Sequence, residues 1–212
     1  MKAILIPVKL FHESKKRLAA HYSPAARAAL AAALCEDFFG VVAQVRGAGR
    51  IFVASQEPRA LSWATARGWE TIVETAQISE SHSVDAASRH CAEQGVRALL
   101  RLPIDIPLAT AQDIDSILSQ AEDAPSAILV PSRDGTGTNA LLRSPPTLFP
   151  SHFGPNSFAL HLDEAERTRA RVKRLRDPRI ELDIDEMDDL SALAGCVRAD
   201  SSIAAWLNAN PF

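Results

Sequence analysis

The chain has 212 residues, enough for one compact domain with a large buried core but too few for two full domains. Hydrophobic residues make up 47% and charged residues 23% of it, which argues against a disordered or fibrous protein. The net charge of −3 offers no basic surface for nucleic acid, and no apolar run reaches the roughly 20 residues that cross a bilayer. We therefore expect a single cytoplasmic domain over residues 1–212, with no nucleic-acid or membrane partner. A homodimer stays open as an assembly.

Short apolar runs of strand length alternate with segments whose apolar residues recur at helical spacing. This alternation predicts an α/β fold with a mainly parallel sheet covered by helices. The predicted strands are residues 3–8, 50–54, 70–73, 98–102 and 127–130.

Two helix starts are marked by their capping residues. Ser23 followed by Pro24 indicates an N-cap and a first helical residue, opening a helix that runs to about Val45. Thr110 and Asp113 have the spacing of a capping box at the start of another helix. The three cysteines, which are odd in number and scattered, are interpreted as buried free thiols: Cys35, Cys91 and Cys196.

The alternating pattern changes after Ser132, where a Gly/Thr loop and a Pro-rich stretch follow. We expect a small insertion with antiparallel pairing here, then a helix over residues 157–167 and a returning strand at about 179–182. Residues 187–194 and 201–208 are predicted to be terminal helices that pack on the sheet.

Four cations lie within nine residues of the end of the first predicted strand: Lys9, Lys15, Lys16 and Arg17. In open α/β sheets, ligands bind outside the carboxyl ends of the strands. A bound triphosphate needs such cations, because its charge must be neutralised before a nucleophile can approach. A solvated basic loop is the alternative interpretation.

Acidic residues follow two predicted strands. Asp105 stands among apolar residues after the fourth strand, and Asp183 and Asp185 follow the strand expected at 179–182, where alternation turns both to one side. Carboxylates from two strand ends can hold Mg²⁺ and leave positions for phosphate oxygens. The alternatives are a helix cap at Asp105 and an ordinary acidic turn.

Two loops could bind anions. The segment 132–140 holds Gly135 and Gly137, and its amides with the Thr136 and Thr138 hydroxyls could form a phosphate-binding concavity; a plain hairpin turn is the alternative. Gly154 precedes a helix that begins near residue 157, where a second anion could bind at the helix N-terminus or where the helix is simply capped.

Other catalytic patterns are missing from the sequence. No histidine pair has metal-ligand spacing, no Gly-x-Ser-x-Gly elbow occurs, and the three tryptophans are not arranged as a stacking platform. A serine hydrolase and a nucleic-acid binder are therefore disfavoured. Single histidines such as His82 and His161 are interpreted as structural or exposed.

Several stretches carry a resemblance to a known family. The more specific ones are Arg-Asp-Gly-Thr-Gly-Thr-Asn at 133–139 and Phe-Gly-Pro-Asn-Ser at 153–157, and the others are residues 6–9, 14–19, 105–108 and 182–186. Together they resemble the CofC/FbiD family of guanylyltransferases, which act in the biosynthesis of the deazaflavin coenzyme F-420.

The resemblance implies a Rossmann-like, GT-A-type nucleotidyltransferase fold. It also implies that GTP and a phosphorylated three-carbon acid react to give a guanosine diphosphoryl adduct and pyrophosphate, with Mg²⁺ or Mn²⁺. Carried over residue by residue, it makes Asp105, Asp183 and Lys9 catalytic. The remaining implied roles are nucleotide binding by Lys9, Lys15 and Arg17, metal binding by Asp105, Asp183 and Asp185, and acceptor-phosphate binding by Thr138, Gly154 and Ser157.

Two departures from the family pattern matter. Ile104-Asp105-Ile106-Pro107 stands where many members have Gly-Asp-Leu-Pro, and Val84-Asp85 stands where many have Leu-Asn. The resemblance places Val84 and Asp85 in the acceptor pocket, which leaves the acid open among 2-phospho-L-lactate, phosphoenolpyruvate and 3-phospho-D-glycerate.

Two other functions stay in view from the sequence. One is a different GT-A-like enzyme of the molybdopterin or sugar-nucleotide type, although the glycine-rich loop usual after the first strand of those enzymes is missing at residues 9–12. The other is a non-catalytic regulator that binds GTP without consuming it.

Overall fold

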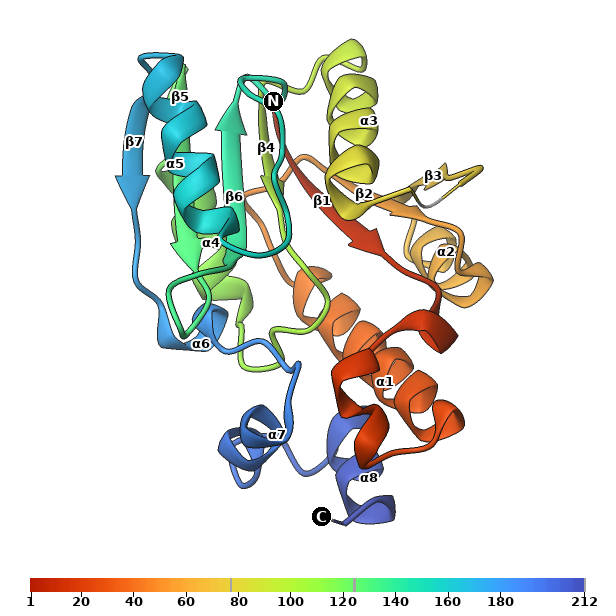
Figure 1. The fold of residues 1–212 in the computed structure, drawn as a ribbon. Helices are drawn as coiled ribbons and strands as arrows, with labels where there is room; N and C mark the ends of the chain where they lie inside the picture. Colours follow the sequence, from red (N-terminus) through yellow and green to blue (C-terminus); the bar gives the residue numbers. More distant parts are fainter. Residues whose placement is uncertain (77, 124, 212) are drawn as a thin grey trace.

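The computed structural model describes residues 1–76, 78–123 and 125–211, and its centre is a sheet with helices on both faces (Figure 1). The strands are β1 (Lys2–Val8), β2 (Arg50–Ser55), β3 (Glu70–Val73), β4 (Ala98–Arg101), β5 (Ser126–Pro131), β6 (Thr138–Ser144) and β7 (Arg171–Arg174). The helices are the 3₁₀ turns η1 (Phe11–Glu13) and η2 (Lys16–Ala20), and the α-helices α1 (Pro24–Val42), α2 (Pro58–Ala66), α3 (Glu80–Glu93), α4 (Ala111–Ser119), α5 (Ser157–Arg167), α6 (Pro178–Glu181), α7 (Met187–Leu193) and α8 (Ser202–Ala209).

The strand order is β3-β2-β1-β4-β6-β5-β7, and β6 alone of these seven runs antiparallel to its neighbours. The chain moves outward from β1 to β2 and β3, and then returns to place β4 on the other side of β1. This reversal opens a crevice at the carboxyl ends of β1 and β4, where open α/β sheets bind ligands. The predicted mainly parallel sheet with a small antiparallel insertion is confirmed.

Alternating side chains divide the core between the two faces of the sheet. Ile4, Ile6 and Val8 of β1 pack in a cluster with α1, α2 and α4, while Ala3 and Leu5 pack with α3 on the other face. Helix α5 covers β5 and β7 on the same face as α3 (Figure 1). Burial on both faces explains why the central strands read as continuous apolar runs.

The predicted helix starts are confirmed. Ser23 accepts a hydrogen bond from Ala26 N at the start of α1, and Thr110 and Asp113 form a reciprocal capping box on α4. Helix α1 ends at Val42, slightly before the predicted Val45.

The predicted returning strand at 179–182 is wrong. Asp177 accepts a hydrogen bond from Arg179 N, and Pro178 occupies the first helical position, so this segment forms the short helix α6. The strand instead lies at β7, which pairs with β5 and forms one edge of the sheet. Its sequence Arg-Val-Lys-Arg lacks the apolar run that predicts a strand, because an edge strand presents charged side chains to solvent.

Two further expectations need correction. The terminal helices α7 and α8 pack with η2 and α1 rather than on the sheet. In α8, Trp206 Nε1 donates to Ala26 O at 2.9 Å, and the Trp206 ring lies 5.0 Å from the Tyr22 ring. Cys35 and Cys91 are buried free thiols as expected, but Cys196 is exposed. Within the described residues, no helix is both long and apolar enough to cross a membrane.

Candidate active site

The expected cations and metal-binding carboxylates gather at the crevice between β1 and β4. The loop after β1 carries Lys9 and Lys15, the loop after β4 carries Asp105, and the irregular segment 182–186 after α6 runs beside both. Ile184 N donates to Asp105 O at 3.0 Å, so the backbone joins the two acidic segments. Residues that lie far apart in the sequence therefore share one edge of the sheet.

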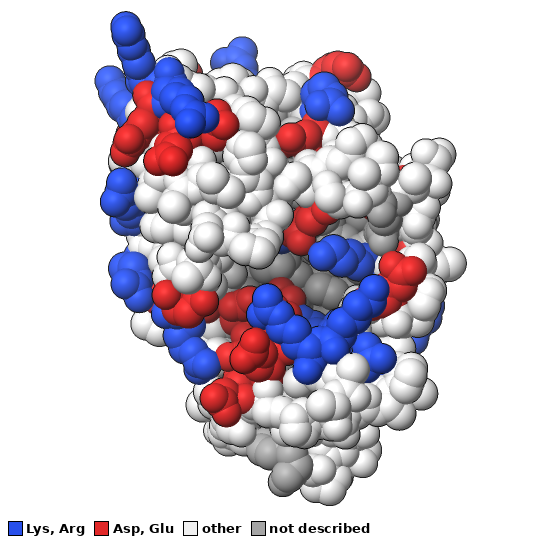
Figure 2. All heavy atoms as spheres, viewed as in Figure 1, with Lys and Arg blue, Asp and Glu red and all other residues white. Residues whose placement is uncertain are grey.

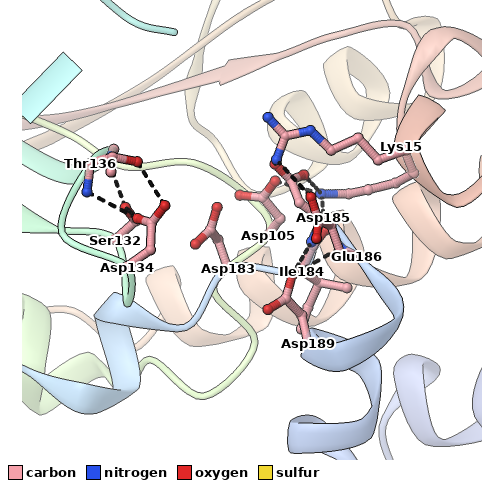
Figure 3. A network of polar contacts seen from close by, with 12 residues as sticks. Lys15, Asp105, Ser132, Asp134, Thr136, Asp183, Ile184, Asp185, Glu186 and Asp189 are labelled. Carbon is pink, nitrogen blue, oxygen red and sulfur yellow. Dashed lines mark hydrogen bonds and ion pairs between the residues drawn. The ribbon is translucent and has the colours of Figure 1, made fainter. Parts of the chain in front are cut away.

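Lys15 is the centre of the polar network in Figure 3. Its ammonium lies 2.5 Å from Asp105 Oδ2, 2.6 Å from Ile184 O and 3.4 Å from Asp185 Oδ1, and its side chain is only 6% exposed. The backbone of Lys15 is in the left-handed region with φ 55°, a conformation that costs about 1 kcal/mol or more for a side chain of this kind. The chain therefore tolerates local strain to aim this lysine inward.

Asp183 faces Asp105 without a cation between them (Figure 3). Its Oδ1 accepts from Asn139 Nδ2 at 3.1 Å, and the same amide donates to Ile180 O and Glu181 O at 3.0 Å each. Asn139 thus fixes the segment that carries Asp183. Sequence reasoning included Asn139 in the loop motif but gave it no role.

The pKa values of Asp183, Asp105 and Lys15 are shifted in different directions at this site. Burial raises the pKa of Asp183 to about 6, and the nearby Asp105 carboxylate adds to the rise. Burial would also raise the pKa of Asp105, but the Lys15 ammonium brings it below its ordinary range. Burial opposes the charge on Lys15, yet Asp105 and Asp185 raise its pKa above the usual value. A charged Lys15–Asp105 pair therefore lies beside a carboxyl group that lacks a counter-charge.

This donor set fits a magnesium ion shared with a nucleotide. Among the described residues, no three acidic, histidine or cysteine side chains are close enough together to hold one metal ion. Asp185, expected as a third ligand, is turned toward Lys15 and Arg17 instead. Mg²⁺ is usually held by only one or two carboxylates together with substrate phosphates and water, so Asp105 and Asp183 meet that need.

Two exposed cations stand at the rim of the crevice. Lys9 is paired with Glu80 at 3.3 Å, and Arg17 is paired with Asp185 at 3.4 Å and Glu186 at 3.5 Å. Figure 2 shows basic and acidic side chains side by side around a hollow on this face. Exposed pairs of this kind contribute little to stability, so either cation can turn to a phosphate at small cost.

The segment 132–137 is a hairpin turn rather than a phosphate-binding concavity. The Asp134 carboxylate accepts hydrogen bonds from Ser132 Oγ, Thr136 N and Thr136 Oγ1, and Gly137 N donates to Ser132 Oγ. A Cβ on Gly137 would lie 2.8 Å from Ser132 Oγ, which explains the glycine. These donors are used inside the turn, as Figure 3 shows for Asp134.

The expected acceptor-phosphate residues do come together. Thr138 on β6 and Ser157 at the start of α5 are both buried, and their hydroxyl oxygens lie 3.2 Å apart. Gly154 is exposed beside them with φ 128°, a region open mainly to glycine. The N-cap residue Asn156 makes no side-chain hydrogen bond to α5, but Ser157 N and Phe158 N donate to Gly154 O and Thr136 O, so an anion here would depend mainly on the two hydroxyls.

Val84 and Asp85 do not line an open pocket. Val84 is fully buried in a cluster with Ala3, Leu5 and Phe52, so its side chain is not exposed to an acceptor in this structure. Asp85 accepts from Ser151 N through both oxygens, at 3.0 and 3.1 Å, and pairs with the buried Arg143 at 3.4 Å. Its carboxylate therefore anchors the loop before Gly154.

A comparison with protein families decides the identity of this arrangement. Residues 1–196 match the model described as guanylyl transferase CofC like. The chain belongs to this family. The resemblance inferred from sequence motifs is thereby confirmed, together with the nucleotidyltransferase enzyme class.

Relatives of this CofC-like chain agree with the family match. A phosphoenolpyruvate guanylyltransferase of Rubrobacter xylanophilus is 35% identical over 191 residues, covering 89% of this chain and 91% of the relative. A 3-phospho-D-glycerate guanylyltransferase of Colwellia psychrerythraea is 28% identical, covering 90% of each chain. A nucleotidyl transferase structure from Methanothermobacter thermautotroptrophicus superposes with a TM-score of 0.64 at 12% identity, over 99% of each chain. This last likeness confirms the fold.

We expect Asp183→Asn to stabilise the metal-free CofC-like protein above pH 6. Since the folded-state pKa of about 6 exceeds the ordinary 3.8, the folded chain binds the extra proton between these values. Stability therefore falls as pH rises through that window, by up to about 3 kcal/mol at about 1.4 kcal/mol per pKa unit.

An amide at position 183 does not ionise, so the variant does not lose folding stability as the pH rises. Thermal unfolding in a chelator at pH 7.5 is expected to show a higher Tm for the variant, and at pH 3.5 no such gain. Mg²⁺ should raise the Tm of wild type more than that of the variant. A lower Tm for the variant at pH 7.5 would refute the assignment of an uncompensated carboxylate.

Proposed function

We propose that this chain transfers GMP from GTP to a phosphorylated three-carbon acid and releases pyrophosphate. The observation that carries the proposal is the charged Lys15–Asp105 pair beside Asp183 at the β1/β4 crevice, in a chain of the CofC-like family. The curated relatives named above support the acid class. The pathway, coenzyme F-420 biosynthesis, rests on the family resemblance, as does a cytoplasmic location.

The reaction proposed is direct displacement at the α-phosphorus of GTP by an oxygen of the acceptor's phosphate. One P–O bond forms to that oxygen as the bond to the leaving pyrophosphate breaks. The acceptor phosphate is already largely ionised near neutral pH, so the protein supplies no nucleophile and no general base. Catalysis is then a matter of positioning and charge neutralisation.

Each part of the site has a role in that displacement. Lys9, Lys15 and Arg17 neutralise nucleotide phosphates, and Asp105 and Asp183 would hold Mg²⁺ or Mn²⁺, which when bound supplies positive charge to the phosphate oxygens. Thr138, Ser157 and the backbone at Gly154 bind the acceptor's phosphate. Because the Asp85 carboxylate is occupied by Ser151 N and Arg143, it gives no reason to prefer one acid over another.

The test is a pyrophosphate-release assay with GTP or ATP and each of three acids: 2-phospho-L-lactate, phosphoenolpyruvate and 3-phospho-D-glycerate. We expect release only when an acid is present, and a kcat/KM for GTP at least about tenfold above that for ATP, equivalent to about 1.4 kcal/mol. Equal kcat/KM values for the two nucleotides would contradict guanylyl specificity. Binding of GTP without release under any condition would indicate the regulator instead.

A further inference from the structure

His161 lies beneath the proposed acceptor subsite and is not used by the mechanism above. It projects from α5, is fully buried, and lies between the Thr138 hydroxyl and the backbone of residue 152. From its sequence context, His161 is expected to be only a structural or exposed histidine.

The hydrogen bonds of His161 determine its tautomer. Its Nε2 accepts from His152 N at 2.8 Å, so this nitrogen carries no proton. Burial, together with the nearby charges of Arg143 and Arg101, lowers the pKa of His161 to about 3, so the ring stays neutral. A neutral imidazole has one N–H, which must then be at Nδ1, 3.0 Å from Thr138 Oγ1.

The Thr138 and Ser157 hydroxyls together carry two hydrogens, and the tautomer of His161 determines how many of them the protein uses. Because Nδ1–H of His161 donates to Thr138 Oγ1, that contact uses neither hydroxyl hydrogen. The contact between the Thr138 and Ser157 oxygens uses one of the two hydroxyl hydrogens, and the other is left for a different acceptor. In the described part of the chain, these two hydroxyls have no further protein partner. One O–H of this pair is therefore available to an acceptor that is not part of the protein.

The surroundings hold His161 in place. The loop above it is tied to α3, since Ser151 N donates to Asp85 and Phe153 N donates to Ser81 Oγ at 2.8 Å. The Phe153 ring packs edge-on against the imidazole at 4.9 Å, and Arg101 stacks on that ring at 4.1 Å. This loop also carries Gly154, so the imidazole, the hydroxyl pair and the glycine are joined in one network of contacts.

We propose that His161 is a positioning residue for the acceptor's phosphate: its Nδ1–H orients the Thr138–Ser157 pair so that one O–H donates to a phosphate oxygen. This inference rests on the proposed function for the assignment of the phosphate to the acceptor acid. It adds a residue that touches no substrate itself and acts through the two hydroxyls.

Two variants of His161 test the roles of its two ring nitrogens separately. In His161→Asn, the side-chain amide can occupy the position of Nδ1 and still donate to Thr138, whereas His161→Gln reaches the position of Nε2 and can only accept from His152 N. Each variant loses one hydrogen bond and fills the cavity incompletely, so both should show a lower Tm. Only the Gln variant loses the orienting donor.

The expected result is a KM for phosphoenolpyruvate raised about tenfold in His161→Gln and less than about threefold in His161→Asn, as one hydrogen bond predicts. The KM for GTP should be unchanged in both. The inhibition constant of inorganic phosphate, competing with the acid, should rise in parallel. Equal changes in the two variants, or equal changes for GTP and acid, would overturn the inference.

Calorimetry with phosphoenolpyruvate and with inorganic phosphate keeps this test separate from the proposed function. If wild type forms no adduct yet binds phosphate more tightly than His161→Gln does, the transfer reaction is refuted and the positioning role stands. If wild type forms the adduct and both variants bind phosphate alike, the transfer reaction stands and the positioning role of His161 is refuted.

Discussion

Asp105→Asn is expected to lower kcat by at least about 1,000-fold while the protein stays folded. The substitution removes one of two facing carboxylates and also the partner of the Lys15 ammonium. Losing a metal ligand removes several kcal/mol of charge stabilisation in the transition state, and about 4 kcal/mol corresponds to this factor.

A matched control is Asp163→Asn, which changes an exposed carboxylate on α5 away from the crevice. Its kcat and Tm should equal those of wild type. Circular dichroism establishes that both variants are folded before rates are compared at saturating Mg²⁺. A near-normal rate for Asp105→Asn under those conditions would refute the metal-site assignment.

Lys15→Met is the second large effect, and it acts on stability and activity together. The ammonium is buried against Asp105, Asp185 and the carbonyl of Ile184, so its removal leaves Asp105 without its paired cation and Asp185 with only the exposed Arg17. Breaking a buried pair in this way costs about 3–5 kcal/mol. We also expect kcat/KM for GTP to fall at least about 100-fold, equivalent to about 2.7 kcal/mol.

Mg²⁺ distinguishes the role of this lysine from simple packing. A divalent ion can replace the lost positive charge, so adding Mg²⁺ should raise the Tm of Lys15→Met more than that of wild type. Lys16→Met is the control, because that side chain is exposed next to it. A Tm for Lys15→Met equal to that of the control, with and without Mg²⁺, would contradict the charge network.

The sequence predicted the elements that periodicity and capping determine. The five apolar strands, the Ser23 and Thr110 caps and the antiparallel insertion are confirmed, because local side-chain chemistry specifies them. The polar edge strand β7 and the helix α6 were missed. In α6 the pair Asp177-Pro178 outweighs the apolar alternation of Ile180 and Leu182, a case in which turn chemistry overrides the period.

The site was predictable in its members but not in its pairings. Strand-end positions indicated Asp105 and the cations after β1, yet nothing local shows that Lys15 contacts Asp185, 170 residues later. Val84 was assigned to a pocket by resemblance, and only the packing of α3 on β1 shows that it is buried. The role of His161 depends on which nitrogen accepts a backbone N–H, a feature that sequence does not encode locally.

The measurement that tests the central claim most directly is identification of the product. Purified protein is incubated with GTP, Mg²⁺ and each acid separately, and the products are analysed by mass spectrometry and phosphorus NMR. The account predicts an adduct with the mass of the acid plus GMP less water, two phosphorus signals coupled through one bridging oxygen, and an equal amount of pyrophosphate. GTP left unconsumed with all three acids, or consumed at the same rate without any acid, would contradict it.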